Sequence, residues 1–261
     1  MSENFLFSRK SCTFAKGKQP YELMKVLAMT TIKELDTEEV SEIICSLWEP
    51  LTSSQRDMLS QNISVERFKK NEMIYKESEH PTKMMFLLRG KVKIFKEGMG
   101  HSQIIRVIKP FEIFGYRAYF AGEEYKTNAM AFEPSTIAFI PMTVIAKLMG
   151  SCQSITQSII RHLATELGNS DERTVSLTQK HIRGRLAEAL LLLKESYGVE
   201  EDGHTLNIYL TREDIANLSN MTTSNAIRTL STFTEEDLIS TDGRKIKILK
   251  EEELRKISRY G

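Results

Sequence analysis

The hydrophobic residues of this chain change their spacing twice along the sequence, and these changes limit the folds that it can adopt. Between about residues 63 and 141, short apolar runs alternate with Gly and Pro turn signals. The runs predict strands at residues 73–75, 84–88, 92–95, 104–108 and 137–140. Several short strands with this punctuation are typical of an antiparallel sandwich or barrel. A small closed barrel has room for one modest ligand, so we expect a β domain that can hold one.

Helical spacing begins after Pro141. Apolar residues then lie three and four residues apart, as at heptad positions a and d, with a slight phase shift before the last two. They are Ile145, Leu148, Cys152, Ile155, Ile159, Leu163 and Leu167. The sequence has no second copy of this seam, so we predict that residues 142–177 form a dimerisation helix whose interface these side chains line. The alternative is an ordinary core helix that lies against the barrel.

Residues 210–230 have the pattern of two short helices joined by a turn. Thr211 is an N-cap with Asp214 as its partner, and Thr222 caps the second helix. The inner face of the second helix is expected to be Ala226, Ile227 and Leu230. The Asp-Gly pair at 242–243 lies between two apolar runs and predicts a hairpin, so the segment is a winged helix-turn-helix.

The polar face of the second helix suits the major groove of DNA. Arginine pairs with guanine and asparagine with adenine, while helix N-termini attract phosphate. No acid occurs between Met221 and Thr234. The candidate DNA contacts are Thr211, Arg212, Thr222, Thr223, Ser224, Asn225 and Arg228, with Arg244 in the hairpin. The alternative is a solvated polar face on a winged helix that binds protein.

Charge and composition exclude several classes of protein. Lys and Arg total 36 and Asp and Glu total 35, and this formal net charge of +1 excludes a uniformly basic nucleic-acid coat. Residues 178–261 hold 13 basic and 14 acidic residues, so we expect local contact with DNA and modest salt dependence. The apolar runs are far shorter than the roughly 18 residues of a membrane span, and no secretory signal follows Arg9 and Lys10. We expect a cytoplasmic protein with no membrane partner.

The cysteines and the missing catalytic motifs argue against a secreted protein, a metal site and an enzyme. The three cysteines, Cys12, Cys45 and Cys152, are scattered, which fits a reducing compartment. No C-x-x-C pair occurs, so no metal site is predicted. The sequence has no P-loop, nucleophile elbow or G-x-G-x-x-G motif, and its strands carry too few His and Glu for a cupin-like enzyme. We therefore expect a protein that is not an enzyme.

Four short motifs occur in the order found in a known family. They are Leu88-x-Gly90-x-Val92, Phe114-Gly115, Gly184-Arg185-Leu186-Ala187 and Leu210-Thr211-Arg212-x-x-Ile215-Ala216. A β-roll, a dimerisation helix and a winged helix-turn-helix resemble the CRP/FNR superfamily of bacterial transcription regulators over about residues 40–250. The resemblance implies an α+β chain in three parts. These are an N-terminal extension at 1–37, an effector-sensing antiparallel β-roll of the cyclic-nucleotide-binding (jelly-roll) type with its dimerisation helix at 38–177, and the winged helix-turn-helix at 178–261.

The resemblance also implies a mode of action. Family members are homodimers in which the roll senses a small effector and the helix-turn-helix domains reorient in response. The dimer binds double-stranded DNA at a palindromic operator and acts as an activator or repressor. Residues 197–205 match the region through which family members contact RNA polymerase. Two alternatives stay open: a haem-, redox- or NO-sensing regulator, and a cyclic-nucleotide-binding regulatory module that acts on a protein partner.

Only about half of the residues that bind cyclic AMP in family members, here called the effector cassette, have counterparts in this chain. In members that bind cyclic AMP, a Glu after Phe-Gly holds the ribose and an Arg-Ser pair holds the phosphate. Tyr116 stands at the Glu position and Lys126-Thr127 at the Arg-Ser position, and lysine lacks the bidentate fork. The candidate effector residues are Phe114, Gly115, Tyr116, Arg117, Lys126 and Thr127, with Ser170 and Asp171 at the helix positions that touch adenine. We expect a small anionic effector rather than cyclic AMP.

Other cofactors and the DNA half-site follow from the same comparison. An iron–sulfur cluster needs several cysteines near the N-terminus, where only Cys12 occurs, so none is expected. Haem needs axial ligands, for which His80, His101 and His162 are the candidates, and each can equally be an ordinary histidine. Cyclic-AMP-type members carry Arg-Glu-Thr where this chain has Thr-Ser-Asn at 223–225. We therefore expect a half-site other than TGTGA, with a guanine still recognised by Arg228.

Overall fold

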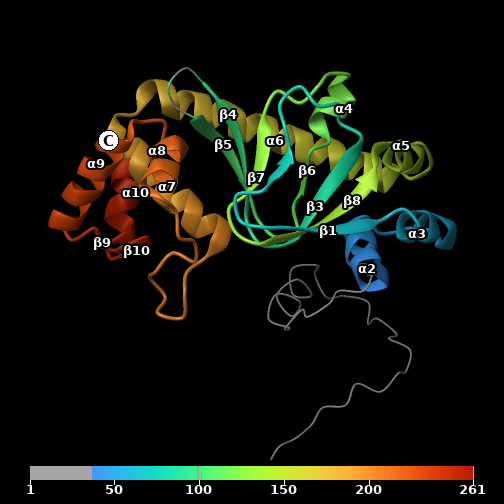
Figure 1. Cartoon of the computed structure of the whole chain (residues 1–261), viewed down its shortest axis with the longest axis horizontal. Coiled ribbons are helices and arrows are strands. Elements are labelled where there is room, and N and C mark those ends of the chain that lie inside the picture. Colours follow the sequence, from blue (N-terminus) through green and yellow to red (C-terminus); the bar gives the residue numbers. More distant parts are fainter. Residues whose placement is uncertain (1–36, 99, 101, 261) are drawn as a thin grey trace, which may run out of the picture.

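The computed structural model describes residues 37–98, 100 and 102–260, so nearly all of the expected extension at 1–37 lies outside the described residues. Figure 1 shows a β domain beside a mostly helical domain, with helix α6 lying along the β domain. Helices α2 (Thr37–Leu47) and α3 (Ser53–Ser60) precede the first strand. The Thr52 side chain accepts a hydrogen bond from the Gln55 amide and Gln55 accepts one from Thr52, which fixes the start of α3.

The β domain is a roll of two four-stranded antiparallel sheets, which confirms the expected fold class. One sheet has the order β1-β8-β3-β6 and the other β2-β7-β4-β5. The strands are β1 (Ser64–Phe68), β2 (Met73–Tyr75), β3 (Lys83–Arg89), β4 (Val92–Glu97), β5 (Ser102–Ile108), β6 (Ile113–Phe114), β7 (Asn128–Ala131) and β8 (Ser135–Pro141). The sequence pattern does not predict β1, β6 or β7, because β1 is largely exposed and the other two are very short.

Large side chains from both sheets fill the interior of the roll. Tyr75, Leu87, Phe114 and Phe139 are buried in one cluster there. Gly90 turns the chain between β3 and β4 with φ at +96°, and a Cβ at this position would clash with Ser135. Only glycine fits this turn, which is the physical reason for the Leu-x-Gly-x-Val motif.

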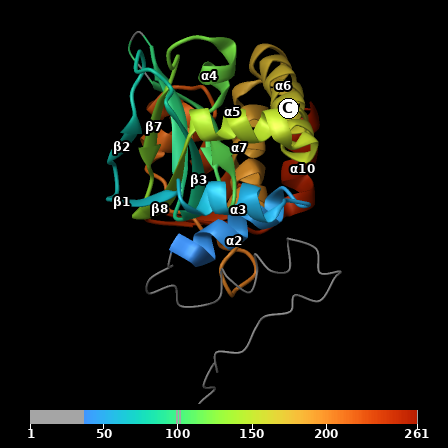
Figure 2. The same cartoon turned by 90° about the vertical axis from the view of Figure 1, so that its right-hand side faces the viewer.

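The chain after β8 forms two helices, so the prediction of a single helix at 142–177 is wrong. They are α5 (Met142–Ser151) and α6 (Gln153–Gln179), and Figure 2 shows them as separate helices. Cys152, between them, has an extended backbone with φ at −135° and ψ at 105°. Gly150 and Ser151 are weak helix formers, and the Ser154 hydroxyl donates a hydrogen bond of 2.8 Å to the Trp48 carbonyl just beyond the break. The seam read as continuous in the sequence therefore lies on two helices.

The helical domain contains the expected helix-turn-helix and wing. It consists of α7 (Ile182–Tyr197), α8 (Arg212–Leu218), α9 (Thr223–Glu235), β9 (Ile239–Asp242), β10 (Lys245–Ile248) and α10 (Glu251–Tyr260). β9 and β10 pair around the Asp-Gly turn, which confirms the hairpin. Residues 206–210 form no strand, although their apolar residues suggest one; only Leu206 among them makes an isolated bridge, with Val199. The sequence pattern also missed α10, which buries Leu254.

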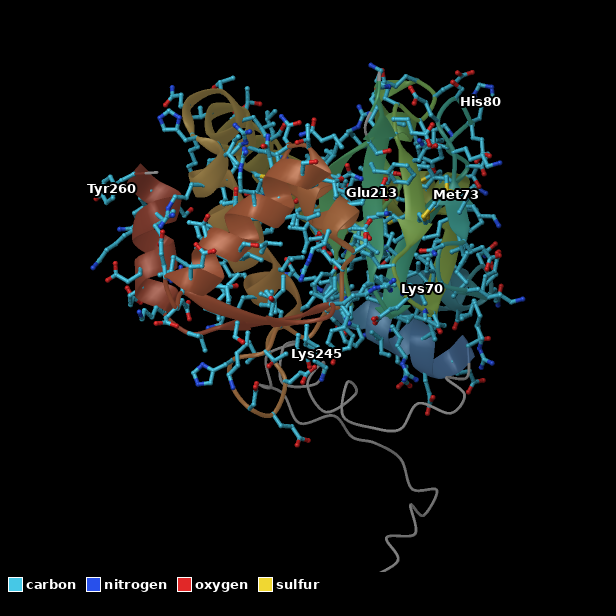
Figure 3. The ribbon with its side chains drawn as sticks, turned by 60° about the vertical axis from the view of Figure 1, so that its left-hand side comes forward. Lys70, Met73, His80, Glu213, Lys245 and Tyr260 are labelled. Atoms are coloured by element: carbon cyan, nitrogen blue, oxygen red, sulfur yellow. The ribbon has the colours of Figure 1, made fainter. Side chains whose placement is uncertain are left out.

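The helical domain packs directly against β4 and β5 of the roll. One hydrophobic cluster contains Phe95 and Ile104 from the roll together with Leu190 from α7 and Ile215 from α8. An ion pair of 2.6 Å joins Lys93 Nζ on β4 to Asp214 Oδ1 on α8. In Figure 3, Glu213, the neighbour of Asp214, lies where α8 meets this sheet. None of the helices in the described part of the chain is both long and apolar enough to cross a membrane.

Candidate DNA interface and effector site

Helix α9 presents a polar face to solvent. Its N-cap Thr222 accepts a hydrogen bond of 3.3 Å from the Asn225 amide, which satisfies a free donor at the helix start. Thr223 and Ser224 are exposed in the first turn, and Arg228 follows one turn later. The inner face is Ala226, Leu230 and Phe233, all buried. The expected inward position of Ile227 is wrong: it is 48% exposed, because the residues at 226, 230 and 233 already fill the contact with the domain core.

Arg228 and Asn225 form a preorganised pair on this face. The Arg228 guanidinium donates a hydrogen bond of 2.7 Å to the Asn225 side-chain oxygen. Arg228 forms no ion pair with any carboxylate of the described residues. The remaining N–H groups of the guanidinium and the Asn225 amide group are therefore available to base edges, which suits recognition of a guanine.

The wing lies beside α9 and is held by Arg212. Gly243, at the tip of the hairpin, has φ at +55°, and Arg244 beside it is exposed. Arg212 Nη2 donates a hydrogen bond of 2.9 Å to the Gly243 carbonyl. The Thr211 hydroxyl donates one of 2.8 Å to Asp214. In this conformation Thr211 and Arg212 thus position α8 and the wing, whereas Thr222, Thr223, Ser224, Asn225, Arg228 and Arg244 form the accessible part of the expected DNA contact.

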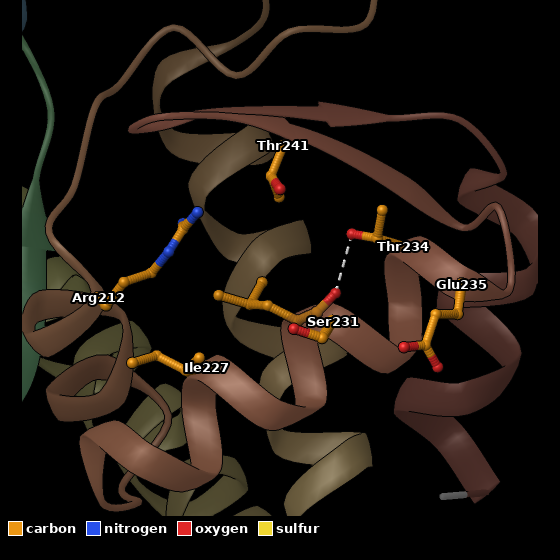
Figure 4. A pocket seen from close by; sticks show the side chains of 7 residues that line it. Arg212, Ile227, Ser231, Thr234, Glu235 and Thr241 are labelled. Atoms are coloured by element: carbon orange, nitrogen blue, oxygen red, sulfur yellow. Dashed lines mark hydrogen bonds between the residues drawn. The ribbon is translucent and has the colours of Figure 1, made fainter.

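A pocket of about 360 Å³ lies between α9 and the wing. Figure 4 shows Arg212 and Thr241 on one side of it and Ile227, Ser231, Thr234 and Glu235 along α9 on the other. Arg212 Nη1 is buried and has no hydrogen-bond partner among the described residues. The recognition helix and the wing are therefore separated by an open groove.

Most acids of this domain are paired with basic residues away from the first turns of α9, which carry the polar face. Arg183 pairs with Glu236 at the far end of the helix and lowers the pKa of that carboxyl. Hydrogen bonds from Lys194 and then Arg255 lower the pKa of Glu251 in the same way. Lys245 and Lys247, on the wing, pair with Glu200 and Asp202 of the loop after α7. The near-zero charge of the domain is therefore compatible with a local contact to DNA through uncompensated cations.

The residues expected to bind an effector in the roll already make contacts with other residues of the chain. Phe114 is buried in the interior, and Gly115 has φ at +79°, where a Cβ would lie 3.0 Å from Met85 Sδ. The Tyr125 hydroxyl donates a hydrogen bond of 3.0 Å to the Gly115 carbonyl, and its ring stacks on Tyr75 at 3.9 Å between centroids. Burial raises the pKa of both phenols. Two stacked tyrosines therefore occupy the space beside the Phe-Gly turn.

The two cations of the cassette share one carboxylate. Helix α4 (Arg117–Ala121) follows the turn, and Arg117 Nη1 lies 2.7 Å from Glu123. Lys126 Nζ lies 2.5 Å from the same carboxylate, and these hydrogen bonds, with that of Lys126 the larger, lower the pKa of Glu123. Thr127 lies close by, with its hydroxyl 3.4 Å from that of Tyr75. The structure thus brings Arg117, Lys126 and Thr127 into one region, as expected, but with an internal anion between the cations that sequence reasoning did not identify.

Tyr116 connects this region to α6. Its side chain is buried, and its ring lies 5.7 Å from that of His162 on α6. Ser170 and Asp171 lie two turns further along α6 and are exposed. No hydrogen bond or ion pair joins these two residues to the other six within the described chain. The eight expected effector residues are therefore split into a cassette of six and an exposed pair on the helix.

The expected dimer interface needs correction. Ile145, Leu148, Cys152, Ile155 and Ile159 are all buried in the core of their own chain, beneath α2 and the roll, and Leu163 packs partly against that core. A fully buried side chain has no surface left for a second copy, so the alternative interpretation, a core helix, holds for these positions. Leu167 is 65% exposed and stays available.

A different apolar row on α6 faces solvent. Ile160 and Val175 are 58% and 51% exposed, and Ala164 and Leu167 lie between them on the same side. The spacing from Ile160 to Ala164 to Leu167 is again four and three residues. The interpretation of residues 142–177 as one helix with one seam overlooked both this second row and the weak helix formers Gly150 and Ser151.

One group of described residues has the composition of a metal site. Ligand atoms of Glu112, His162 and Glu166 lie within 4.8 Å of one another. Arg106 forms ion pairs with both carboxylates, so its guanidinium already supplies the positive charge there. Of the haem candidates, His80 is an exposed neighbour of Glu124 and His101 lies outside the described residues. His162 Nε2 is buried and has no hydrogen-bond partner within the described part of the chain, where it lies near Tyr116 and the two carboxylates.

Models of two protein families match this chain in the order of its domains. The cyclic nucleotide-binding domain matches residues 65–152, and the Crp-like helix-turn-helix domain matches residues 184–257. The first match covers the roll and α5, and the second runs from α7 to α10. The chain is therefore a DNA-binding transcription regulator with a cyclic-nucleotide-binding-like sensor domain.

Known regulators resemble the chain over most of its length. The fumarate and nitrate reduction regulatory protein of Vibrio cholerae is 25% identical over 211 residues, 80% of this chain and 84% of that protein. The CRP-like cAMP-activated global transcriptional regulator of Mycobacterium tuberculosis is 22% identical over 203 residues, 77% of this chain and 91% of its own. The structure of FixK2 from Bradyrhizobium japonicum shares the fold, with a TM-score of 0.68 and 21% identity over 75% of this chain and 96% of that one. This protein belongs to the CRP/FNR family, as its motifs led us to expect.

Proposed function

We propose that this regulator acts as a homodimer that pairs through α6 and binds a palindromic operator with two half-sites. The observation that carries the proposal is the exposed row of Ile160, Ala164, Leu167 and Val175, which runs along a helix whose opposite face is buried in its own core. An apolar stripe at heptad spacing is stable when a second helix covers it, and a twofold axis supplies an identical stripe. The two α9 helices then face two half-sites about one helical turn apart.

The contacts of α6 with both domains support a gated mechanism. Arg173 donates hydrogen bonds to the Ile104 and Ile105 carbonyls of β5 and, at 3.2 Å, to the Leu218 carbonyl at the end of α8. A shift of α6 in the dimer thus moves the roll and the first helix of the helix-turn-helix together. An effector in the roll reorients the reading domains through this junction. RNA polymerase contacts the loop at 197–205, the family position for that interaction.

We further propose that the effector is a small anion other than cyclic AMP. Tyr116 lacks the carboxylate that would hold a ribose, and its side chain is buried against α6. An anion that binds Arg117 and Lys126 must first displace Glu123. Of the haem candidates among the described residues, His80 lies on the surface beside Glu124. His162 lies beside the charged group of Arg106, Glu112 and Glu166 rather than in apolar surroundings.

Sedimentation and operator selection test the dimer together. We expect the wild-type chain to sediment at twice 29.9 kDa and to select a palindrome from random duplexes. Leu167→Asp places a charge on the exposed row, so we expect a monomer that binds the palindrome at least a hundredfold more weakly. Thr165→Asp, an exposed polar position off the row, is the matched control and should leave both properties unchanged. A wild-type monomer, or a Leu167→Asp dimer, would contradict the pairing through α6.

A further inference from the structure

Ile227 stands apart from the other large apolar residues of α9. It is 48% exposed, while Leu230 is 3% exposed and Phe233 is fully buried. It lies one turn after Thr223 and directly before Arg228, in the middle of the polar face. Its exposed surface therefore belongs to the face that carries hydroxyl, amide and guanidinium groups rather than to the core.

The surroundings of Ile227 open toward the wing. Figure 4 shows its side chain at the edge of the pocket between α9 and β9, opposite Thr241. The buried Leu230 lines the same pocket, as does Ser231, one turn further along the helix. A group that approaches α9 in front of Arg228 therefore contacts the Ile227 methyl groups directly.

The chemistry of the side chain restricts what it can recognise on DNA. Isoleucine has no hydrogen-bond donor or acceptor, so it cannot distinguish the polar edges of base pairs. The major groove presents one apolar group to such a side chain, the C5-methyl of thymine. The β-branched side chain has few rotamers and is therefore already ordered for this contact.

We propose that Ile227 recognises the C5-methyl group of a thymine in each half-site, within about two base pairs of the guanine recognised by Arg228, since consecutive helical residues differ by a rise of about 1.5 Å. This inference rests on the proposed function, because it requires α9 in a major groove. The selected half-site is thus a guanine and a nearby thymine, distinguished by a cation and by an apolar side chain respectively.

Replacing thymine with deoxyuridine tests the contact, since it removes one methyl group and leaves every hydrogen-bonding group in place. The operator obtained by selection is synthesised with each thymine replaced in turn, symmetrically in both half-sites. Fluorescence anisotropy at one fixed salt concentration measures Kd for each duplex. For the wild-type chain we expect one position at which the replacement weakens binding about fourfold per half-site, the factor associated with burial of one methyl group.

The variant Ile227→Ala completes a double-mutant cycle. We expect it to bind the thymine and deoxyuridine operators equally, because the side chain that contacts the methyl group is gone. Leu249→Ala truncates another exposed apolar residue of the same domain, 42% exposed, and should keep the full discrimination. Both variants should retain the wild-type melting temperature, since neither side chain contributes to the core.

Failure of the inference and failure of the proposed function give different results. A chain that selects no DNA sequence overturns both. A chain that selects an operator but tolerates deoxyuridine at every position overturns only the inference, as does a discrimination that survives in Ile227→Ala.

Discussion

The sensor and the recognition helix hold their functional side chains in opposite ways. On α9, Thr223, Ser224 and Arg228 face solvent, and Arg228 has no carboxylate partner among the described residues. In the roll, the cassette is occupied by Tyr125, and its cations are paired with Glu123. The proposed DNA-contact surface is thus formed within one chain, whereas the cations of the proposed effector cassette are already paired with a carboxylate of the chain itself. Under the proposed function, the effector therefore changes the position of a recognition surface that is already formed.

Truncation in the closed cassette should have the largest effect. Tyr125→Ala removes a stacked, buried ring and its hydrogen bond to Gly115, so we expect the free energy of unfolding to fall by about 3–5 kcal/mol. Urea denaturation measures this loss. Thr223→Ala, on the open recognition face, should stay within about 0.5 kcal/mol of the wild type. Equal effects of the two variants would remove the contrast between the two regions.

Truncation on the open face should change DNA binding instead of folding. Arg228→Ala should cost about 1–3 kcal/mol at one base pair and relax the preference for guanine there, without a change in stability. Competition binding with operators altered at single positions measures it. Arg259→Ala removes an exposed cation from α10 and is the matched control. A loss that is equal for all sequences would make Arg228 a phosphate contact.

The Lys93–Asp214 ion pair tests how far the two regions are independent. Both side chains are largely buried, with 14% and 17% exposed, and they join β4 to α8. A double-mutant cycle with Lys93→Met and Asp214→Asn should give a coupling of about 1 kcal/mol in unfolding experiments. A coupling free energy near zero would mean that this ion pair does not hold α8 against the roll in solution.

Opening the cassette should have the smallest effect on the fold and a measurable effect on ligands. Glu123→Gln removes the carboxylate that Lys126 and Arg117 keep ionised by lowering its pKa. We expect calorimetry to show a severalfold gain in affinity for inorganic phosphate and for cyclic AMP. Glu124→Gln, the adjacent acid beside His80, is the matched control and should change neither affinity. An unchanged affinity in Glu123→Gln would show that this carboxylate does not compete with anions for Arg117 and Lys126.

Local patterns in the sequence determined much of the architecture. The cap at Thr211, the cap at Thr222 and the turn at Asp242-Gly243 are satisfied by groups a few residues away, so their hydrogen bonds could be anticipated from spacing. The strands with long apolar runs and Gly or Pro boundaries were predicted for the same reason. The helix-turn-helix, the wing and the family followed from these signals.

Only the tertiary structure decided which side of each element is covered. The heptad spacing on α5 and α6 is a property of the helix, but Ile155 is buried and Leu167 exposed because the roll lies against one face only. Ile227 is exposed because Ala226, Leu230 and Phe233 already complete the inner face of α9. Glu123 lies between Arg117 and Lys126 through a turn that brings the three side chains together. Periodicity is set by neighbours in the sequence, whereas burial and charge pairing are set by residues that meet only when the chain has folded.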